Sequence, residues 1–277
     1  MDVKRIDGLA YREATPSASN GDESVVLLIH GFPESSYMWR EVMSAVAESG
    51  WRALALDMPC MGDSDTDLPG TWERQVDAIE RFRSALGLER VALVMHDWGG
   101  LSGMRWACDH PDAVSAMVIS SSGFFADGKW HGMAKAMRTR GDGEKLVEGM
   151  EREGFGGLLT SLSSGFDAAA IDECWKAFAD SDRRQATLDF YRSCDFEKLE
   201  PYDGKLAALG VPTLILWGED DAFAPLAGGK RFERELPDAR LVVFEGAGHF
   251  VVDDEPQRYG KEVADFLAAE VAQPERS

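Results

Sequence analysis

The sequence predicts an α/β fold in which a mostly parallel sheet is covered by helices and carries an inserted helical lid. Short apolar runs bounded by turn residues alternate with helical patterns, which is typical of parallel strands joined by crossover helices. The alternation stops between about residues 123 and 202, where helix formers dominate. The 277 residues, of which 44% are apolar, are sufficient for a large hydrophobic core.

The strands and helices of the core follow from their apolar periodicity. A hairpin is expected at the N-terminus, because 3–6 and 9–12 flank Asp7-Gly8, a dipeptide that favours a tight turn. Buried parallel strands are expected at 25–29, 52–56, 91–95, 113–119, 213–217 and 241–244. Helices are expected at 37–48, 71–86, 101–110 and 257–271.

The helical insertion divides the chain into a core formed by 1–122 and 203–277 and a lid formed by 123–202. It lies between two predicted parallel strands, so it should emerge at the carboxyl edge of the sheet, where open α/β folds bind their ligands. We therefore expect this segment to cover a binding site.

The amino-acid composition limits the classes of binding partner and the cellular compartment that we expect. Lys and Arg number 29 against 49 Asp and Glu, a formal charge of -20 that disfavours nucleic acid and anionic membrane surfaces. The four cysteines show no C-x-x-C spacing, so we expect reduced thiols in a cytoplasmic protein, with neither a zinc site nor a disulfide framework. The sequence has no signal-like apolar region and no apolar stretch of about 18 residues, so no membrane span is expected.

A candidate nucleophile follows the strand at 91–95. Residues 96–100 (HDWGG) have the pattern of a nucleophile elbow, a strand-to-helix turn that exposes its central side chain. That residue is Asp97, not Ser. An aspartate would form an anhydride in acyl transfer, but it can displace a leaving group from an sp3 carbon and form an alkyl ester. The elbow thus favours alkyl substrates; the alternative is a strand-end Asp that caps the next helix.

Two backbone N–H groups are candidates for an oxyanion hole. Residues 30–33 (HGFP) follow the strand at 25–29 and can aim the N–H of Phe32 into the site. With the N–H of Trp98, it would hold the oxyanion formed when water attacks the ester of alkylated Asp97. An ordinary strand-to-helix loop is the alternative for this segment.

Two further motifs that follow predicted strands contain a candidate acid and a candidate base. Asp221 stands in 218–221 (GEDD) and His249 in 246–250 (GAGHF), each just beyond a predicted strand. The order Asp97, Asp221, His249 is that of triads on one α/β scaffold. His249 would activate water, and Asp221 would fix its tautomer and stabilise the imidazolium. With nucleophile, base and water present, no metal or organic cofactor is needed.

These motifs resemble the α/β-hydrolase superfamily, within it the epoxide hydrolase and haloalkane dehalogenase branch, over essentially the whole core. Residues 30–35 (HGFPES) and 96–100 are close to the epoxide hydrolase pattern. Residues 57–65 (DMPCMGDSD) resemble the family's D-x-x-G-x-G-x-S-D segment, with Cys60 where Gly is usual. The resemblance implies the nucleophile Asp97, the base His249 with its acid partner Asp221, and the oxyanion donors Phe32 and Trp98.

Opening an epoxide requires a proton donor for the leaving oxygen, and in the family that the chain resembles lid tyrosines usually supply it. Residues 188–192 (LDFYR) are similar to the family's aromatic-Tyr-Arg motif, which implies Tyr191. A second lid tyrosine has no match in the first half of the lid. His131 is a candidate to replace this second tyrosine there, and Tyr202, at the hinge, is a weaker candidate. The alternative for Tyr191 is a packed lid aromatic.

Expelling a halide requires N–H donors instead. In the dehalogenase branch the Trp after the nucleophile gives one, which implies the indole of Trp98. The second is commonly an Asn after His-Gly, where this chain has Phe32, or else a lid Trp, for which Trp130 and Trp175 are candidates. Trp130 and the adjacent His131 could also simply line the pocket.

The sequence thus predicts hydrolysis of an epoxide to a diol through an alkyl ester on Asp97, with Tyr191 protonating the leaving oxygen. The alternatives are a haloalkane dehalogenase with the same triad and a non-catalytic ligand receptor on the same scaffold. The expected partners are a small apolar substrate and water, and the oligomeric state is left open.

Overall fold

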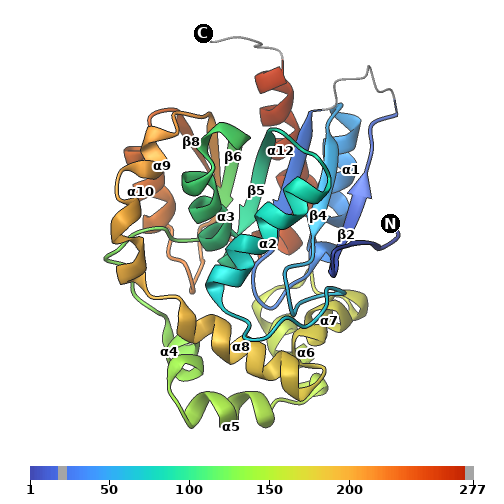
Figure 1. Cartoon of the computed structure of the whole chain (residues 1–277), viewed down its shortest axis with the longest axis vertical. Coiled ribbons are helices and arrows are strands. Elements are labelled where there is room, and N and C mark those ends of the chain that lie inside the picture. The colour runs from blue at the N-terminus through green and yellow to red at the C-terminus, as the bar shows by residue number, and fades with distance from the viewer. Residues whose placement is uncertain (18–23, 272–277) are drawn as a thin grey trace.

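The computed structural model describes residues 1–17 and 24–271, so the final residues of the expected core segment 203–277 lie outside it. One eight-stranded sheet with the strand order β1-β2-β4-β3-β5-β6-β7-β8 passes through the molecule (Figure 1). The predicted fold class, an α/β core with a mostly parallel sheet, is confirmed. The strands are β1 (Lys4–Ile6), β2 (Leu9–Ala14), β3 (Val25–Ile29), β4 (Arg52–Leu56), β5 (Val91–His96), β6 (Val114–Ser120), β7 (Thr213–Gly218) and β8 (Ala239–Phe244).

The N-terminal hairpin forms as its turn residues predict. Strands β1 and β2 pair antiparallel with Ile6 opposite Leu9, and both Asp7 and Gly8 between them have positive φ. Two positive φ values are what a tight turn needs to match the twist of the strands. β2 also pairs antiparallel with β4, and from β4 to β8 all neighbours are parallel.

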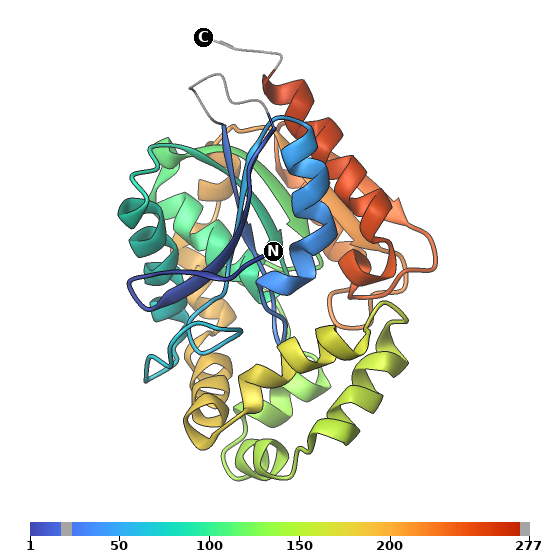
Figure 2. The same ribbon diagram turned by 90° about the vertical axis from the view of Figure 1, so that its right-hand side faces the viewer.

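Helices cover both faces because alternate residues of each buried strand point to opposite sides. In β3, Val26 and Leu28 join the apolar cluster under α1 and α12, while Leu27 and Ile29 join the one on the side of α2 and α3. Figure 2 shows these helix pairs on opposite sides of the sheet. Their bounds are α1 (Arg40–Glu48), α2 (Trp72–Ala85), α3 (Trp98–Asp109) and α12 (Pro256–Val271), with α9 (Lys205–Ala208), α10 (Ala227–Glu235) and α11 (Val251–Asp254) in the second half of the core.

Most of the chain between β6 and β7, from α4 to η4, forms a helical layer beyond the carboxyl ends of the parallel strands, which both views show below the sheet (Figures 1 and 2). This layer, called the lid from here on, lies within the expected segment 123–202, whose exact boundaries stay a prediction. Its helices are α4 (Gly132–Arg138), α5 (Asp142–Glu148), α6 (Arg152–Leu162), α7 (Ala168–Trp175) and α8 (Ser181–Ser193), with 3-10 turns at η3 (Lys176–Phe178) and η4 (Phe196–Tyr202).

None of the helices in the described ranges is long and apolar enough to cross a membrane. All four cysteines are free thiols, and three of them, Cys60, Cys174 and Cys194, are buried.

Candidate active site

The segment between β5 and α3 makes the sharp turn that the sequence predicts. Asp97 has φ 49° and ψ -122°, a conformation that residues with a side chain rarely adopt and that is found mainly at functional sites. Glycines permit the close approach of the neighbouring loops. A Cβ on Gly99 would lie 2.3 Å from the carbonyl oxygen of Ile29, and one on Gly31 would lie 2.5 Å from the Cβ of Asp97.

The end of β6 fixes the backbone of this turn. The N–H of Asp97 donates to the carbonyl of Ser120 at 3.1 Å, which continues the parallel pairing by one residue. The hydroxyl of Ser122 donates to the carbonyl of Asp97 at 2.6 Å. Both backbone groups of Asp97 are therefore held, and its side chain is left to the site.

The three predicted triad residues lie together. His249 donates from Nδ1 to both carboxylate oxygens of Asp221, at 3.0 and 2.9 Å, and its Nε2 lies 3.6 Å from Oδ1 of Asp97. Asp221 is held in turn by the backbone N–H groups of Phe223 and Ala224, at 2.9 and 2.8 Å. A base oriented by a fixed carboxylate and facing a second one is the arrangement that nucleophilic catalysis requires.

The electrostatics of these groups depend on one another. Burial alone would lower the pKa of His249, but hydrogen bonds and charges of Asp221 and Asp97 outweigh it and raise the pKa to about 10. Burial raises the pKa of each Asp, and the hydrogen bond and charge of His249 more than offset this, so both pKa values lie below the ordinary range. Near neutral pH the site thus holds an imidazolium between two carboxylates.

The two predicted oxyanion donors lie beside Asp97. The N–H of Phe32 donates to Oδ2 of Asp97 at 2.9 Å. Trp98 is the first residue of α3, so its N–H has no acceptor within the helix and points out of the helix N-terminus. Charge that develops on the Asp97 carboxyl group would meet both donors.

Tyr191 reaches this centre from α8. Its side chain is 3% exposed and packs edge-on against Phe32 and Trp98, with ring centroids 5.2 and 5.0 Å away. Burial and the charge of Asp97 raise the pKa of Tyr191, while a hydrogen bond with the Trp98 side chain opposes the rise. The phenol of Tyr191 is therefore protonated at neutral pH and lies buried beside the ring of Trp98.

Two cavities meet at Asp97 and share the side chains of His131, Phe223 and His249. The narrow arm, of about 50 Å³, runs under the lid past Tyr191 and is lined by thioether and aliphatic groups of Met133, Met137, Met150, Leu158, Leu159 and Leu162. The wide arm, of about 350 Å³, runs toward the lid hinge and is lined by residues that include Trp98, Ser121, Phe125, Trp130, Phe196 and Pro225.

The other lid residues singled out by the sequence fall into two groups. Trp130 stacks on Trp98 at 5.2 Å and lines the wide arm, and His131 lines both arms. Trp175 packs inside the lid against Phe155 and lines neither arm.

Tyr202 also lies away from both arms. Its hydroxyl donates to Asp109 and accepts from Arg105, each at 3.1 Å, so it joins the hinge to α3. The direction in which a lid side chain points could not be predicted from its position in the sequence, because packing between the lid helices determines that direction.

Sequence reasoning missed two groups of residues near the centre. Phe223 separates the rings of His131 and His249, with both centroids 5.1 Å from its own. Behind the triad, buried His96 donates from Nε2 to the carbonyl of His249 at 2.9 Å, and its Nδ1 lies 3.2 Å from Glu34. For Glu34 and His96, the available signal was their position inside the motifs at 30–35 and 96–100.

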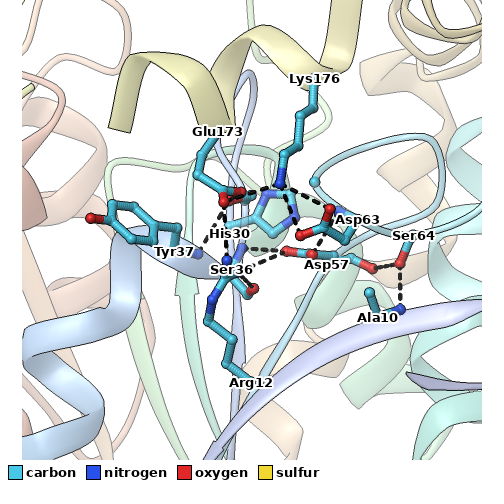
Figure 3. Close-up of polar contacts among 12 residues, drawn as sticks. Ala10, Arg12, His30, Ser36, Tyr37, Asp57, Asp63, Ser64, Glu173 and Lys176 are labelled. Atoms are coloured by element: carbon cyan, nitrogen blue, oxygen red, sulfur yellow. Dashed lines mark hydrogen bonds and ion pairs between the residues drawn. The ribbon is translucent and has the colours of Figure 1, made fainter. Parts of the chain in front are cut away.

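A polar cluster ties the lid to the core on one side of the site. Figure 3 shows Glu173 and Lys176 of the lid facing Arg12, Asp57 and Asp63 of the core. Glu173 lies 3.1 Å from Arg12 and 3.0 Å from Lys176, which in turn donates to Asp63 at 2.9 Å. The loop with the sequence DMPCMGDSD is therefore a docking point for the lid.

Within the described part of the chain, no three His, Cys, Asp or Glu side chains come together in a way that could hold a metal ion. The titratable groups at the centre are those of the triad, Tyr191 and His131. Burial lowers the pKa of His131, and the charge of Asp97 acts against this, so His131 is neutral at neutral pH.

Comparisons with known proteins identify the family and the fold. A family model described as alpha/beta hydrolase fold matches residues 24–256. A 2-hydroxy-6-oxononadienedioate/2-hydroxy-6-oxononatrienedioate hydrolase of Paraburkholderia xenovorans is 29% identical over 96% of this chain and 93% of its own. Epoxide hydrolase 2 of Caenorhabditis elegans is 28% identical over 91% of this chain and 76% of its own length. The structure of a haloalkane dehalogenase from Bradyrhizobium elkani superposes with a TM-score of 0.79 at 23% identity, covering 98% of each chain, which shows the shared fold.

Proposed function

The chain belongs to the alpha/beta hydrolase fold family, and on this premise we propose that it is an epoxide hydrolase that forms a diol through an alkyl ester on Asp97. The observation that carries the proposal is the placement of Tyr191. It lines the same arm as Asp97, and its raised pKa keeps the phenol protonated at neutral pH, so it can supply a proton to a leaving oxygen bound there. General acid catalysis of this kind contributes about 10²–10⁴-fold in rate.

In the first step, a carboxylate oxygen of Asp97 attacks an epoxide carbon. The carbon–oxygen bond of the ring breaks, and its electron pair goes to the epoxide oxygen, which takes the proton of Tyr191. Asp97 loses its charge when the ester forms. That charge is among the causes that raise the pKa of both Tyr191 and His249. The proton of His249 can then replace the one that Tyr191 has given up.

In the second step, neutral His249 takes a proton from water, and the resulting hydroxide attacks the ester carbonyl. The N–H of Phe32, already 2.9 Å from an oxygen of Asp97, is placed to hold the oxyanion together with the N–H of Trp98. Collapse expels the diol oxygen, which takes the remaining proton of the attacking water. The carboxylate and the imidazolium are restored, and the net reaction consumes one water.

Carbon–carbon bond hydrolysis, named for one of the relatives, fits these residues less well. That reaction involves a carbonyl carbon, and attack on it by a carboxylate such as Asp97 would produce an anhydride. An sp3 carbon gives a stable ester that water can then hydrolyse. The proposal therefore follows the epoxide hydrolase relative.

Haloalkane dehalogenation is the second candidate, and one observation favours it. The indole Nε1 of Trp130 is buried without a hydrogen-bond partner among the residues that the structure describes, and its ring stacks on Trp98. Two indole N–H groups could hold a halide. Against this, the ring of Trp98 packs edge-on against Tyr191, with ring centroids 5.0 Å apart, which favours a site built around the tyrosine.

The test is to incubate the protein with matched panels of epoxides and haloalkanes and to measure diol and free halide. We expect diol formation, and replacement of Tyr191 by Phe should slow it by about 10²-fold or more while affecting any halide release far less. Tyr202→Phe is the matched control, because that tyrosine lines neither arm. Halide release without any diol would overturn the proposal, and equal effects of Tyr191→Phe on both reactions would reduce Tyr191 to packing.

A further inference from the structure

The large apolar side chains that line the wide arm are almost all aromatic rings. The rings belong to Trp98, Phe125, Trp130, Phe196 and Phe223. Of the described residues that line this arm, Leu101 is the only Leu, Ile, Val or Met. All the rings except that of Trp98 are half-buried, so each keeps some open surface. The arm therefore offers aromatic surface to a group bound next to Asp97.

Three of the rings form a continuous row that begins at the nucleophile elbow. Trp130 stacks on Trp98 with ring centroids 5.2 Å apart and 22° between the ring planes, and Phe196 follows Trp130 at 4.5 Å. Gly128 closes on the outer end of the row, since a Cβ there would lie 2.5 Å from two carbon atoms of the Phe196 ring. Packing thus fixes the row before a ligand binds, so binding does not have to order these side chains.

The volumes of the two arms determine which of them can hold a ring. An apolar cavity of about 150 Å³ binds benzene. The wide arm, with about 350 Å³, exceeds this volume, and the narrow arm, with about 50 Å³, falls well below it. A group in the narrow arm must therefore be slender. Flexible side chains that line this arm, such as Met133 and Leu162, suit an unbranched alkyl chain.

Charge does not favour an ionic substituent in the wide arm. Apart from Asp97 and His249, the one charged residue that lines it, among those described, is the exposed Lys129. An exposed ammonium group stays hydrated and contributes little to an ion pair. The aromatic surface, and not a charge, is thus the feature that can select a substituent there.

We infer that the substrate is an uncharged epoxide with an aryl group, which binds against the rings of the wide arm, and an unbranched alkyl group, which binds in the narrow arm. The inference rests on the proposed function and names the substrate class of the same site. Aromatic pairs attract each other beyond the effect of buried area alone. Phe125 and Phe196, which line the wide arm and not the narrow one, are then specificity-determining residues.

The test compares two epoxides of nearly the same shape. The first carries a benzyl group on one ring carbon and a propyl group on the other, and the second has cyclohexylmethyl in place of benzyl. The CH₂ group separates the phenyl ring from the epoxide, so the two compounds differ little in intrinsic reactivity. One ring contact is worth about two- to tenfold in binding, so we expect the wild type to favour the benzyl epoxide by at least about twofold in kcat/KM. Burial alone would not give this preference, since cyclohexyl is at least as apolar as phenyl.

Phe196→Leu keeps an apolar side chain but removes a ring. It should lower kcat/KM for the benzyl epoxide about two- to tenfold and leave its isostere nearly unchanged. Phe125→Leu makes the same change elsewhere in the arm and replaces Phe196→Leu if that variant does not fold. Phe124→Leu is the matched control, because Phe124 is buried, packs on Tyr202 with ring centroids 5.8 Å apart and lines neither arm. A wild type without the preference, or a preference that survives in both variants, would overturn the inference.

A third epoxide, with benzyl groups on both ring carbons, tests the narrow arm. One of its phenyl rings has to enter that arm, and overpacking there should slow turnover about fivefold or more relative to the benzyl–propyl epoxide. Met133 is half-buried on α4 and lines the narrow arm alone, so Met133→Ala should make room and restore part of this loss. Equal turnover of the two epoxides by the wild type would contradict the assignment of the arms.

Binding separates this inference from the proposed function. Asp97→Asn lacks the carboxylate nucleophile, so calorimetric titration of this variant with the benzyl–propyl epoxide and its cyclohexylmethyl isostere measures recognition alone. The benzyl epoxide should bind about two- to tenfold more tightly, and adding Phe196→Leu should remove most of the difference. If the wild type forms no diol from either epoxide but this difference is found, the proposed function fails and aryl recognition by the wide arm stands. Equal binding of the two epoxides, or binding of neither, overturns the inference.

Discussion

At the scale of residues, the charge of Asp97 is felt by two neighbouring titratable groups, Tyr191 and His249. It contributes to the raised pKa of Tyr191 and to the pKa of His249, which is about 10. In the proposed mechanism both effects would end when Asp97 becomes an ester. Tyr191 would then hold its proton less tightly at the moment when an alkoxide needs it, and His249 would become a base at the moment when water must be activated. One covalent bond would thus switch the site between the two proposed steps.

The first prediction concerns His249. Replacement by Gln removes the base but leaves Asp97 able to attack, so the ester should accumulate. Intact mass spectrometry after incubation with a turned-over substrate should show an adduct of the mass of that substrate, and peptide mapping should place it on Asp97. The double variant with Asp97→Asn should show none. Absence of the adduct with every substrate that the wild type converts would exclude the covalent mechanism.

The second prediction concerns Gly99, which lets α3 approach β3. A Cβ there would lie 2.3 and 2.5 Å from the carbonyl oxygens of Ile29 and His30, both backbone atoms that cannot move away alone. Overpacking of this kind costs about 1–3 kcal/mol or more, so Gly99→Ala should lower the free energy of unfolding by at least about 1 kcal/mol, as measured by denaturant titration, and should abolish activity.

Gly157→Ala is the control for this substitution. Gly157 lies in α6, and a Cβ there would meet no atom within 4 Å. Ala should stabilise the helix by about 0.4–1 kcal/mol, because it restricts the unfolded chain. A Gly99→Ala variant as stable and active as the wild type would show that the elbow does not need the close approach.

At the scale of elements, the lid is held to the core by charged groups on one side and by the aromatic hinge around Tyr202 on the other. Arg183, at the start of α8, donates to three carbonyl groups of the loop between β4 and α2, those of Cys60, Gly62 and Ser64, at 2.7 to 3.2 Å. Arg12 and Glu173 add an ion pair across the same boundary. These contacts anchor this side of the lid to the core.

The third prediction tests that anchor. Glu173 is 16% exposed and accepts from Arg12, Ser35 and Lys176. Hydrogen bonds to charged groups contribute about 1.5–3 kcal/mol, so Glu173→Gln should let α7 open more often. We expect amide exchange in α7 to accelerate about tenfold or more, with α12 unaffected.

Asp172→Asn on the same helix is the control for the anchor. Asp172 pairs with Arg152 outside the site, and both side chains are largely exposed, at 61% and 43%. Such a pair contributes little, so exchange in α7 should hardly change. Equal exchange in both variants would mean that apolar packing, and not the charge cluster, anchors the lid.

The parts of the structure that could be predicted from the sequence are those that local residue patterns specify. Strands such as Val25–Ile29 are buried on both faces, so their apolar runs and turn residues specify them locally. Asp97, Asp221 and His249 could be placed because each follows a strand whose direction was known. Lid side chains follow no strand of known direction, so their orientation could not be predicted in this way. Trp175 was a candidate for the pocket only through the family resemblance, and packing inside the lid turns its side chain away from both arms.

For the whole molecule, the net charge of -20 is unevenly divided between core and lid. Residues 123–202 hold 15 acidic and 11 basic side chains, so the lid carries only -4 and the core -16. The arms that converge on Asp97 are lined mainly by apolar groups, most of them from the lid. The charge therefore affects the stability and solubility of the scaffold more than the choice of an uncharged substrate.

The last prediction follows from that charge. Repulsion among like charges opposes the compact state, whereas ion pairs such as Lys261 with Asp265 favour it, and salt weakens both. Exposed pairs contribute about 0–1 kcal/mol each and many contribute nothing, so the repulsion should dominate in a chain with 20 uncompensated negative charges. We expect Tm at pH 7 to rise by about 2–4 °C when sodium chloride is raised from roughly 0.01 to 0.3 M. Potassium chloride should act equally, since screening does not depend on the cation. A Tm that falls with salt would mean that the ion pairs outweigh the repulsion.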